Sequence, residues 1–354
     1  MLVVNLSHVS SKPTGLSNYA TNVVPYMHDL RPTLLSSLQT VQGQYYPIPV
    51  GMGPEYGAKG HIKRLAWTQY VLPKICERLG SGLLFSPIPE APLGSQLRYV
   101  VTAHDLIPLR FSPRASRLRL YFRYYVGSVL KSADHILCNS QSTATELTNF
   151  YGFHESKMTV TPLAHNDSLF TPLSLPTKNY FLYVGRHDIH KNLIRLVEAF
   201  AKVAMHQDYE LWLVGSQHRQ YSANIHQRAD ELAVSKKVKL IDYLPDSQIN
   251  EVVNQAIALV FPSLWEGFGL PVLEAMACGT PVITSNISAL SEVAGDAAIL
   301  VNPYSVDEIA DAMRMVATDS RLRDRLRETG LERSRQFSWE KTGKKTVEAL
   351  QRFI

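Results

Sequence analysis

Two glutamates, Glu266 and Glu274, lie eight residues apart on either side of a glycine loop at residues 267–269. Glycine lets backbone N–H groups approach a ligand closely, and carboxylates accept hydrogen bonds from hydroxyl groups. Pro271 then fits the first turn of a short helix, where its missing N–H is not needed. A helix N-terminus favours phosphate or sugar oxygens. The segment predicts a site for a ligand that carries hydroxyl groups and anionic oxygens.

Two cations lie in the segment YFLYVGRHDIHKN in the middle of the chain. Arg186 and Lys191 stand on a turn between an expected strand and a helix that begins at Leu193, whose N-terminus would point at the same ligand. Two cations and a helix dipole together form a diphosphate site. His187 and His190 share this turn. Because the pattern offers no third ligand, we interpret them as solvated rather than metal-bound.

Two further candidates come from the first half of the chain. The segment His8–Tyr19 follows an apolar run and places Gly15 just before a helix expected to start near Ser17. This pattern is typical of a ligand-covering loop, or of a plain strand-to-helix turn. His104 ends another apolar run, Arg98–Ala103, where its ring can bind a hydroxyl group or support a neighbouring residue.

Short apolar runs alternate with helical patterns along the whole chain. The runs are continuous, as expected of parallel strands covered on both faces. The expected strands are Leu2–Leu6, Leu83–Phe85, Arg98–Ala103, His135–Cys138, Tyr180–Val184, Glu210–Val214, Val238–Ile241, Ile257–Phe261, Pro281–Thr284 and Ala298–Val301. This repetition predicts an α/β fold with doubly wound, Rossmann-like sheets. In such sheets ligands bind beyond the carboxyl ends of the strands, where the residues named above collect.

The length of 354 residues favours two domains. We expect the linker in the aperiodic stretch from Pro162 to Lys178, with one domain at residues 1–168 and another at 169–337. The pattern from Trp339 to Phe353 predicts an amphipathic helix, at about 338–354, that packs back on the first domain.

Composition and motifs exclude several classes of protein. No apolar run reaches the roughly 18 residues of a spanning helix, and Met1–Leu6 resembles a buried strand rather than a signal peptide. Cys76, Cys138 and Cys278 lie far apart, without metal-ligand spacing or a disulfide framework. We therefore expect a cytoplasmic protein. No Asp-x-Asp occurs, so no metal cofactor is expected, and no glycine fingerprint of a nicotinamide dehydrogenase follows a strand.

The net charge of +5 belongs to the first half, where residues 1–168 carry 15 Lys/Arg against 9 Asp/Glu. Most of the excess lies between Arg110 and Lys131, with aromatic residues interleaved and no acid. The segment is either a solvated helix face, a contact with an anionic membrane, or a site for a phosphate-bearing acceptor. Nucleic acid ranks last, because no nucleic-acid-binding motif accompanies the patch.

The motifs Gly185-Arg186…Lys191-Asn192 and Glu266-Gly-Phe-Gly-Leu-Pro…Glu274-Ala-Met-Ala-Cys-Gly-Thr-Pro-Val resemble glycosyltransferase family 4, whose members are retaining enzymes with the GT-B fold. In that fold two Rossmann-like domains face a central cleft. The first half, with Pro13-Thr-Gly15 and His104-Asp-Leu-Ile-Pro, is similar to bacterial members that build extracellular polysaccharides and O-antigens. One departure is Ala164-His165-Asn166, where the family usually has Gly-Val-Asp.

The resemblance implies a role for each motif. Residues 1–168 would form the acceptor-side domain and 169–337 the domain that binds the nucleotide-sugar donor. Arg186 and Lys191 would bind the donor diphosphate, and Glu274 the ribose hydroxyls. The transferred sugar would contact Glu266, the loop and, from the other domain, His104. Further donor contacts would come from Gly15, Gly215, Tyr243, Leu244, Gly267, Phe268, Gly269 and Leu270.

These features predict a metal-independent hexosyltransferase, with UDP-glucose favoured as donor over GDP-mannose and a glycan or polyprenyl-diphosphate-linked acceptor. A GT-B-fold sugar-nucleotide epimerase would act on the donor alone. A sugar-nucleotide-binding protein would bind the donor without transfer. Both remain alternatives at this stage.

Overall fold

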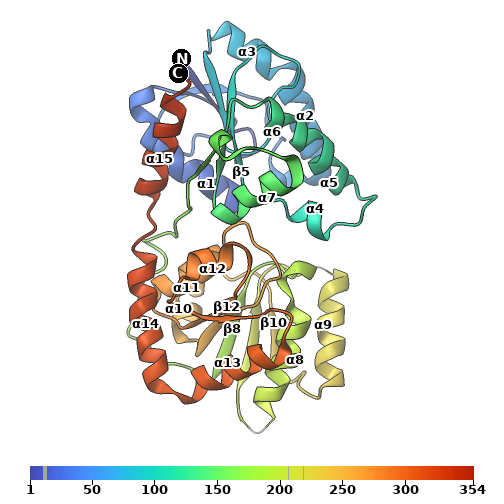
Figure 1. Ribbon diagram of the computed structural model, residues 1–354, viewed down its shortest axis with the longest axis vertical. Helices are drawn as coiled ribbons and strands as arrows, with labels where there is room; N and C mark the ends of the chain where they lie inside the picture. Colours follow the sequence, from blue (N-terminus) through green and yellow to red (C-terminus); the bar gives the residue numbers. More distant parts are fainter. Residues whose placement is uncertain (11–13, 206, 218) are drawn as a thin grey trace. The chain divides into compact units, whose positions relative to one another are not determined.

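The computed structural model describes residues 1–10, 14–205, 207–217 and 219–354 of the chain. Two compact units divide it: Met1–Leu163 with Ser338–Ile354, and Ala164–Phe337. Figure 1 shows that each unit is a twisted sheet flanked by helices. The predicted α/β class with two doubly wound sheets is confirmed.

The first unit has a seven-stranded parallel sheet in the order β3-β2-β1-β4-β5-β6-β7. The strands are β1 Leu2–Asn5, β2 Thr33–Ser36, β3 Gln44–Pro47, β4 Leu83–Ser86, β5 Tyr99–Ala103, β6 His135–Cys138 and β7 Met158–Val160. Three of these, β2, β3 and β7, were not predicted. Two of them, β3 and β7, form the edges of the sheet and are only partly buried, so they lack a continuous apolar run.

Helices cover both faces of this sheet. They are α1 Gly15–Val23, η1 Val24–Leu30, η2 Pro54–Tyr56, α2 Gly57–Tyr70, α3 Leu72–Arg78, α4 Ile107–Phe111, α5 Arg117–Leu120, η3 Tyr121–Val126, α6 Gly127–Ser132, α7 Gln141–Tyr151, η4 Glu155–Lys157 and α15 Trp339–Gln351. Helix α15 packs against α1 and η1. Its Thr342 hydroxyl donates to the carbonyl of Pro162, which ties the last helix to the end of β7.

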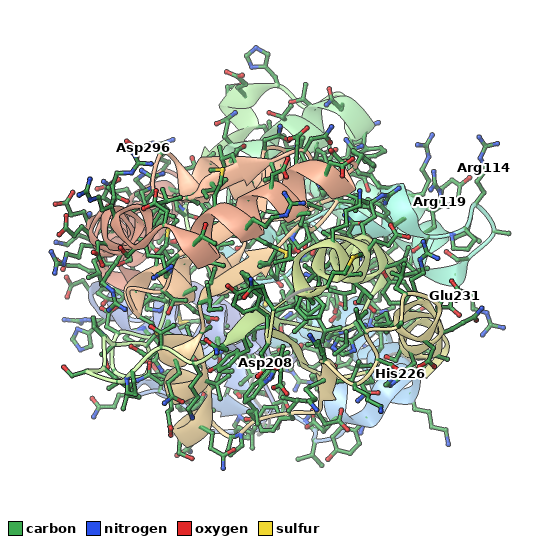
Figure 2. The ribbon with its side chains drawn as sticks, turned by 90° about the horizontal axis from the view of Figure 1, so that it is seen from below. Arg114, Arg119, Asp208, His226, Glu231 and Asp296 are labelled. Carbon is green, nitrogen blue, oxygen red and sulfur yellow. The ribbon has the colours of Figure 1, made fainter. Side chains whose placement is uncertain are left out.

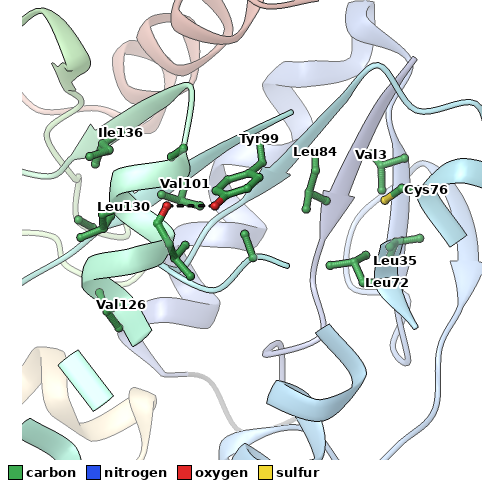
Figure 3. Packing of buried hydrophobic residues seen from close by; sticks show 14 of the residues in the cluster. Val3, Leu35, Leu72, Cys76, Leu84, Tyr99, Val101, Val126, Leu130 and Ile136 are labelled. Carbon is green, nitrogen blue, oxygen red and sulfur yellow. Dashed lines mark hydrogen bonds between the residues drawn. The ribbon is translucent and has the colours of Figure 1, made fainter. Parts of the chain in front are cut away.

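One apolar cluster lies between this sheet and the helices on one of its faces. Val3, Leu84 and Val101 from the central strands are fully buried against Leu72 of α3 and Leu130 of α6. Figure 3 shows these side chains together, with the Tyr99 hydroxyl donating to the carbonyl of Val129 at 3.1 Å. Helices α2, α3 and α6 therefore pack on the same face of the sheet.

The second unit has a six-stranded parallel sheet in the order β10-β9-β8-β11-β12-β13. The strands are β8 Tyr180–Val184, β9 Glu210–Val214, β10 Val238–Ile241, β11 Ala258–Phe261, β12 Val282–Ser285 and β13 Ile299–Val301. The helical segments are η5 Ile189–Lys191, α8 Leu193–Ala204, α9 Arg219–Glu231, α10 Asp246–Gln255, α11 Leu270–Ala277, α12 Ser288–Ala294, α13 Val306–Thr318 and α14 Ser320–Ser334. All six predicted strands of this half are confirmed, within a residue or so at their ends.

Charged side chains lie on the surface of both units, as Figure 2 shows for Arg114 and Arg119 of the first unit and for Glu231 and Asp296 of the second. No helix in the described part of the chain combines the length and the apolar character that a membrane crossing requires.

Candidate functional site

The second sheet reverses its strand order between β8 and β11, and the predicted chemistry gathers at this reversal. Gly185 and Arg186 follow β8 directly, and Glu266 lies on the segment that leaves β11. Ligands of open α/β sheets bind beyond the carboxyl ends of the strands at such a reversal. The fold therefore brings both predicted motifs of this unit to one edge of the sheet.

Close backbone approach at this edge requires glycine at two positions. Gly185 and Gly215 have φ values of 148° and 139°, which L side chains rarely adopt. A Cβ atom at Gly215 would lie 2.2 Å from the carbonyl oxygen of Gly185. Backbone packing thus already demands glycine at 215, independently of any contact with a nucleotide base.

Lys191 and Glu266 form a direct ion pair, with 2.6 Å between Nζ and Oε1. Their side chains keep only 14% and 10% of their exposure. The Lys191 ammonium group also lies 5.3 Å from the centroid of the Phe261 ring, a favourable cation–π arrangement. The sequence places both residues at one site but gives no sign that they pair with each other.

The backbone around Lys191 is held by its neighbour Asn192. Asn192 has a left-handed conformation, with φ of 64°, and is buried. Its side-chain amide donates to the carbonyl of Pro262 at 3.0 Å and to that of Pro303 at 2.7 Å. The Leu264 N–H donates to the carbonyl of His190 at 2.7 Å. These bonds fix the β8–α8 turn against the segment after β11.

Arg186 is exposed and forms an ion pair with Asp188 at 3.3 Å. The backbone beneath it is held by Tyr183, a fully buried residue of β8 whose hydroxyl donates to the Arg186 carbonyl at 3.0 Å. The Tyr183 ring stacks on Phe261, with ring centroids 5.4 Å apart. Through their stacked rings, Tyr183 and Phe261 therefore connect the backbone of Arg186 with the ammonium group of Lys191. The sequence does not predict this connection. An aromatic residue in a buried strand normally signals only packing.

One of the two histidines of the turn departs from the prediction. His187 is fully buried, with Nδ1 at 3.4 Å from the Ser222 hydroxyl, so the expectation that it is solvated is wrong. His190 is half-buried. Burial, followed by the charge of Lys191, lowers the pKa of His190 to about 4, so its ring is neutral at pH 7. Among the described residues, no cluster of three or more His, Cys, Asp or Glu side chains could hold a metal ion.

The glycine loop leads into α11 as predicted. Gly269 has φ of 114°, and a Cβ atom there would lie 2.7 Å from the Leu290 side chain. Gly279 ends the helix with φ of 71°. The Phe268 ring is buried edge-on against Phe337, at 5.9 Å between centroids. Only the backbone of Phe268 is therefore free to face a ligand, beside the first N–H groups of the helix.

Glu274 is half-buried in the second turn of α11. Burial raises the pKa of its carboxyl to about 7. In the part of the chain that the structure describes, no hydrogen-bond donor or cation pairs with this carboxyl. A carboxyl group that is buried without a partner costs folding free energy, which is typical of a group kept for a ligand.

Tyr243 and Leu244 follow β10, the outermost strand on one side of the sheet. The Tyr243 side chain is 77% exposed, whereas Leu244 is half-buried. Exposed tyrosine rings suit stacking on a flat ligand. In the described residues, no hydrogen bond, ion pair or ring contact joins either residue to the Lys191–Glu266 pair.

His104 and Gly15 belong to the first unit. His104 follows β5, and its Nε2 lies 2.8 Å from the carbonyl oxygen of Pro87. A carbonyl only accepts, so Nε2 carries the hydrogen and Nδ1 is left as an acceptor. Burial lowers the pKa of His104 to about 4, which keeps the ring neutral.

Gly15 is the first residue of α1, two residues before the predicted start, and Thr14 caps the helix by accepting from the Ser17 N–H. Part of the predicted loop, residues 11–13 with Pro13, lies outside the described residues. His8, at the start of that loop, is buried, and burial lowers its pKa to about 3.

Two family models match the chain. One, described as Glycosyltransferase Family 4, matches residues 15–168, and another, described as Glycosyl transferases group 1, matches residues 167–333. O-antigen chain mannosyltransferase B from Escherichia coli is 30% identical over 268 residues, which cover 71% of this chain and 70% of that protein. O-antigen chain mannosyltransferase RfbU from Salmonella typhimurium is 26% identical and covers 85% and 87%.

Solved structures show the same fold at low sequence identity. Sucrose-phosphate synthase from Thermosynechococcus elongatus matches with a TM-score of 0.78 at 18% identity, over 99% of this chain and 98% of that one. HepE from Anabaena, in complex with UDP and glucose, matches with a TM-score of 0.75 at 17% identity over 99% of both. The solved structures show the GT-B fold. The E. coli relative and the two family models show that the chain belongs to glycosyltransferase family 4, as a bacterial polysaccharide glycosyltransferase.

Proposed function

We propose that this glycosyltransferase transfers a hexosyl group, with retention of anomeric configuration, from a nucleotide sugar to a glycan or lipid-linked acceptor. The Lys191–Glu266 ion pair at the β8–β11 reversal supports this most strongly. Its ammonium and carboxylate groups lie 2.6 Å apart, next to the N-terminus of α11, where they would serve the diphosphate and the sugar hydroxyls of one donor. One bound molecule with both groups would use the whole arrangement.

We favour mannose from GDP-mannose as the donor, ahead of the UDP-glucose expected from sequence alone. The support is the run of relatives named mannosyltransferases, among them the O-antigen enzymes. UDP and glucose bound to Anabaena HepE support the second choice.

The chemical step breaks the bond between the anomeric carbon and the diphosphate oxygen and forms a bond from that carbon to an acceptor oxygen. The electron pair stays with the leaving diphosphate, where Lys191 and Arg186 stabilise the charge. Because Glu266 is already paired with Lys191, we infer same-face attack without a covalent enzyme intermediate. The acceptor proton then passes to a diphosphate oxygen. His104, through Nδ1, would accept a hydrogen bond from a substrate hydroxyl.

We propose a polyprenyl-diphosphate-linked acceptor, reached by a cytoplasmic enzyme that rests on the inner face of the membrane. The segment Arg110–Lys131 supports this contact. Its exposed residues include Arg114, Arg117 and Arg123. Such a basic patch attracts anionic lipid.

A thermal-shift screen of nucleotide sugars tests the donor assignment, since a ligand stabilises the folded protein in proportion to its binding. GDP-mannose is expected to give the largest shift. Lys191→Ala and Glu266→Ala should each lose transfer by at least about tenfold, while Lys236→Ala, an exposed lysine of the same unit, should not. Wild-type transfer rates in both site variants would contradict the proposal.

A further inference from the structure

The segment that runs from β11 to Glu266 is bonded to the neighbouring strand by hydroxyl side chains. In β12, the Thr284 hydroxyl donates to the carbonyl of Phe261 at 2.9 Å. The next residue, Ser285, donates to the carbonyl of Ser263 at 2.7 Å. Thr284 and Ser285 are both fully buried, so the two bonds are shielded from water. The chain therefore leaves β11 along a fixed path toward Glu266.

Ser288 continues this series of bonds at Glu266 itself. It is the first residue of α12, a helix that lies beside α11 (Figure 1). The Glu266 N–H donates to the Ser288 hydroxyl oxygen at 3.2 Å, which joins residues 22 positions apart. The Ser288 carbonyl in turn accepts from the Ser291 hydroxyl at 3.2 Å. Ser288 thus holds the backbone of Glu266, while Lys191 pairs with the carboxylate.

The backbone of Ser288 takes a conformation that serine rarely adopts. Its φ of 58° lies in the left-handed region, where the Cβ atom crowds the backbone. Glycine would adopt the same conformation without this crowding. Strained residues of this kind cluster at functional sites. Serine supplies a hydroxyl group that glycine lacks, and the Glu266 N–H uses that hydroxyl.

The same helix also limits the far end of the glycine loop. Gly269 precedes α11, and a Cβ atom there would lie 2.7 Å from the side chain of Leu290 in α12. Leu290 is fully buried, so it has little room to give way. Helix α12 therefore holds the loop at both ends, at Glu266 through a hydrogen bond and at Gly269 through packing.

We propose that Ser288 is a positioning residue that fixes the Glu266 carboxylate against the hydroxyl groups of the transferred sugar, and so sets how sharply the enzyme discriminates between sugars. This role rests on the proposed contact between Glu266 and the donor sugar. A carboxylate that is held in one place accepts from a hydroxyl in one configuration, whereas a carboxylate that can shift also accommodates the epimer. Ser288 acts through Glu266 rather than on the sugar.

Two substitutions separate the hydroxyl group from the backbone strain. Ser288→Ala removes the hydroxyl and keeps the strain, whereas Ser288→Gly removes both. The matched control is Ser320→Ala, which removes an exposed serine hydroxyl at the start of α14. Circular dichroism verifies that each variant is folded, and thermal melting measures its stability. Ser288→Gly should melt about 2–4 °C above Ser288→Ala, because glycine relieves the strain.

Isothermal titration calorimetry of the full chain then measures the Kd of GDP-mannose, GDP-glucose and GDP. The two nucleotide sugars differ in the configuration of one hydroxyl group, and GDP lacks the sugar. If the thermal-shift screen selects a uridine donor, UDP-glucose, UDP-galactose and UDP take their place. The ratio of the two sugar-nucleotide Kd values does not depend on how much of a variant is folded, and no acceptor is needed.

The wild type and Ser320→Ala should discriminate between the two nucleotide sugars by at least about tenfold, because a misplaced hydroxyl forfeits a hydrogen bond to a charged group. Both Ser288 variants should lose about fivefold of this discrimination, while their Kd for GDP changes by less than about twofold. Discrimination that follows the melting temperature, kept by Ser288→Gly and lost by Ser288→Ala, would overturn the role of the hydroxyl. Wild-type discrimination in both variants, or an equal loss of GDP binding, would also overturn it.

Glu266→Ala separates the role of Ser288 from the proposed function. If Glu266→Ala keeps the full discrimination, the proposed contact between Glu266 and the sugar fails, and the role of Ser288 fails with it. If Glu266→Ala loses the discrimination while both Ser288 variants keep it, only the role of Ser288 fails.

Discussion

Removing the negative charge of Glu274 should make the folded protein more stable at neutral pH. In the folded chain burial raises the pKa of this carboxyl from 4.5 to about 7. Between these values the unfolded chain releases the proton and the folded chain keeps it. The free energy of unfolding therefore falls as pH rises from about 4.5 to about 7, and the loss is complete above pH 7.

The size of the loss follows from the shift. Each pKa unit corresponds to about 1.4 kcal/mol of unfolding free energy, so the shift from 4.5 to about 7 corresponds to about 3 kcal/mol. This is an upper value, because the Glu274 side chain is only half-buried. Glu274→Gln removes the titrating group while keeping its shape. The variant should match the wild type near pH 4.5 and exceed its stability by up to about 3 kcal/mol at pH 8.

Urea unfolding of the donor-free protein at pH 5, 6, 7 and 8 measures this difference, with Glu328→Gln as an exposed control on α14. The slope of each transition is recorded with the midpoint, because two units can unfold separately. A stability difference that does not change with pH, or a Gln variant less stable than the wild type at pH 8, would refute the reasoning. The same variant should bind nucleotide sugar more weakly, since an ionised carboxylate accepts hydroxyl hydrogen bonds more strongly than an amide.

Three further outcomes are expected. Tyr183→Phe should lower kcat by about tenfold or less, because one hydrogen bond holds the Arg186 backbone; steady-state kinetics with an unchanged kcat would contradict this. Gly215→Ala should yield little folded protein, because its Cβ would lie 2.2 Å from the Gly185 carbonyl oxygen; normal expression and melting would count against it. Transfer should continue in EDTA, since Arg186 and Lys191 supply the positive charge at the diphosphate, and abolition of transfer by the chelator would show that a metal is required.

The second unit could be predicted closely from sequence because its strands are short continuous apolar runs and its turns carry glycine or proline. The α11 segment, from Pro271 to its cap at Gly279, is an example in which each local preference agrees with the fold. The same reasoning found β1 but not β3, where a partly exposed edge strand reads QYYP and has no apolar run.

The sequence predicted which charged residues gather at the candidate site, but not the interactions that hold them in position. The Lys191–Glu266 pair joins residues that are 75 positions apart. Tyr183 donates its hydroxyl hydrogen bond to the Arg186 carbonyl, and the local sequence does not predict the direction of that hydroxyl. Asn192 takes a left-handed conformation at the start of a helix, where asparagine usually caps from an extended one. Outside the site, in the first unit, Arg64 of α2 forms a buried ion pair with Glu90 at 2.7 Å. The sequence gives no sign of this pair either, because a lone arginine in a basic helix resembles a surface residue.

A crystal structure with a bound nucleotide sugar tests the central claim most directly. The account predicts that the Lys191 ammonium and the Arg186 guanidinium each lie about 3 Å from diphosphate oxygens, with Glu266 and Glu274 on hydroxyl groups of the same molecule. A donor held elsewhere on the second unit, with the Lys191–Glu266 pair unchanged and Arg186 still on Asp188, would contradict it.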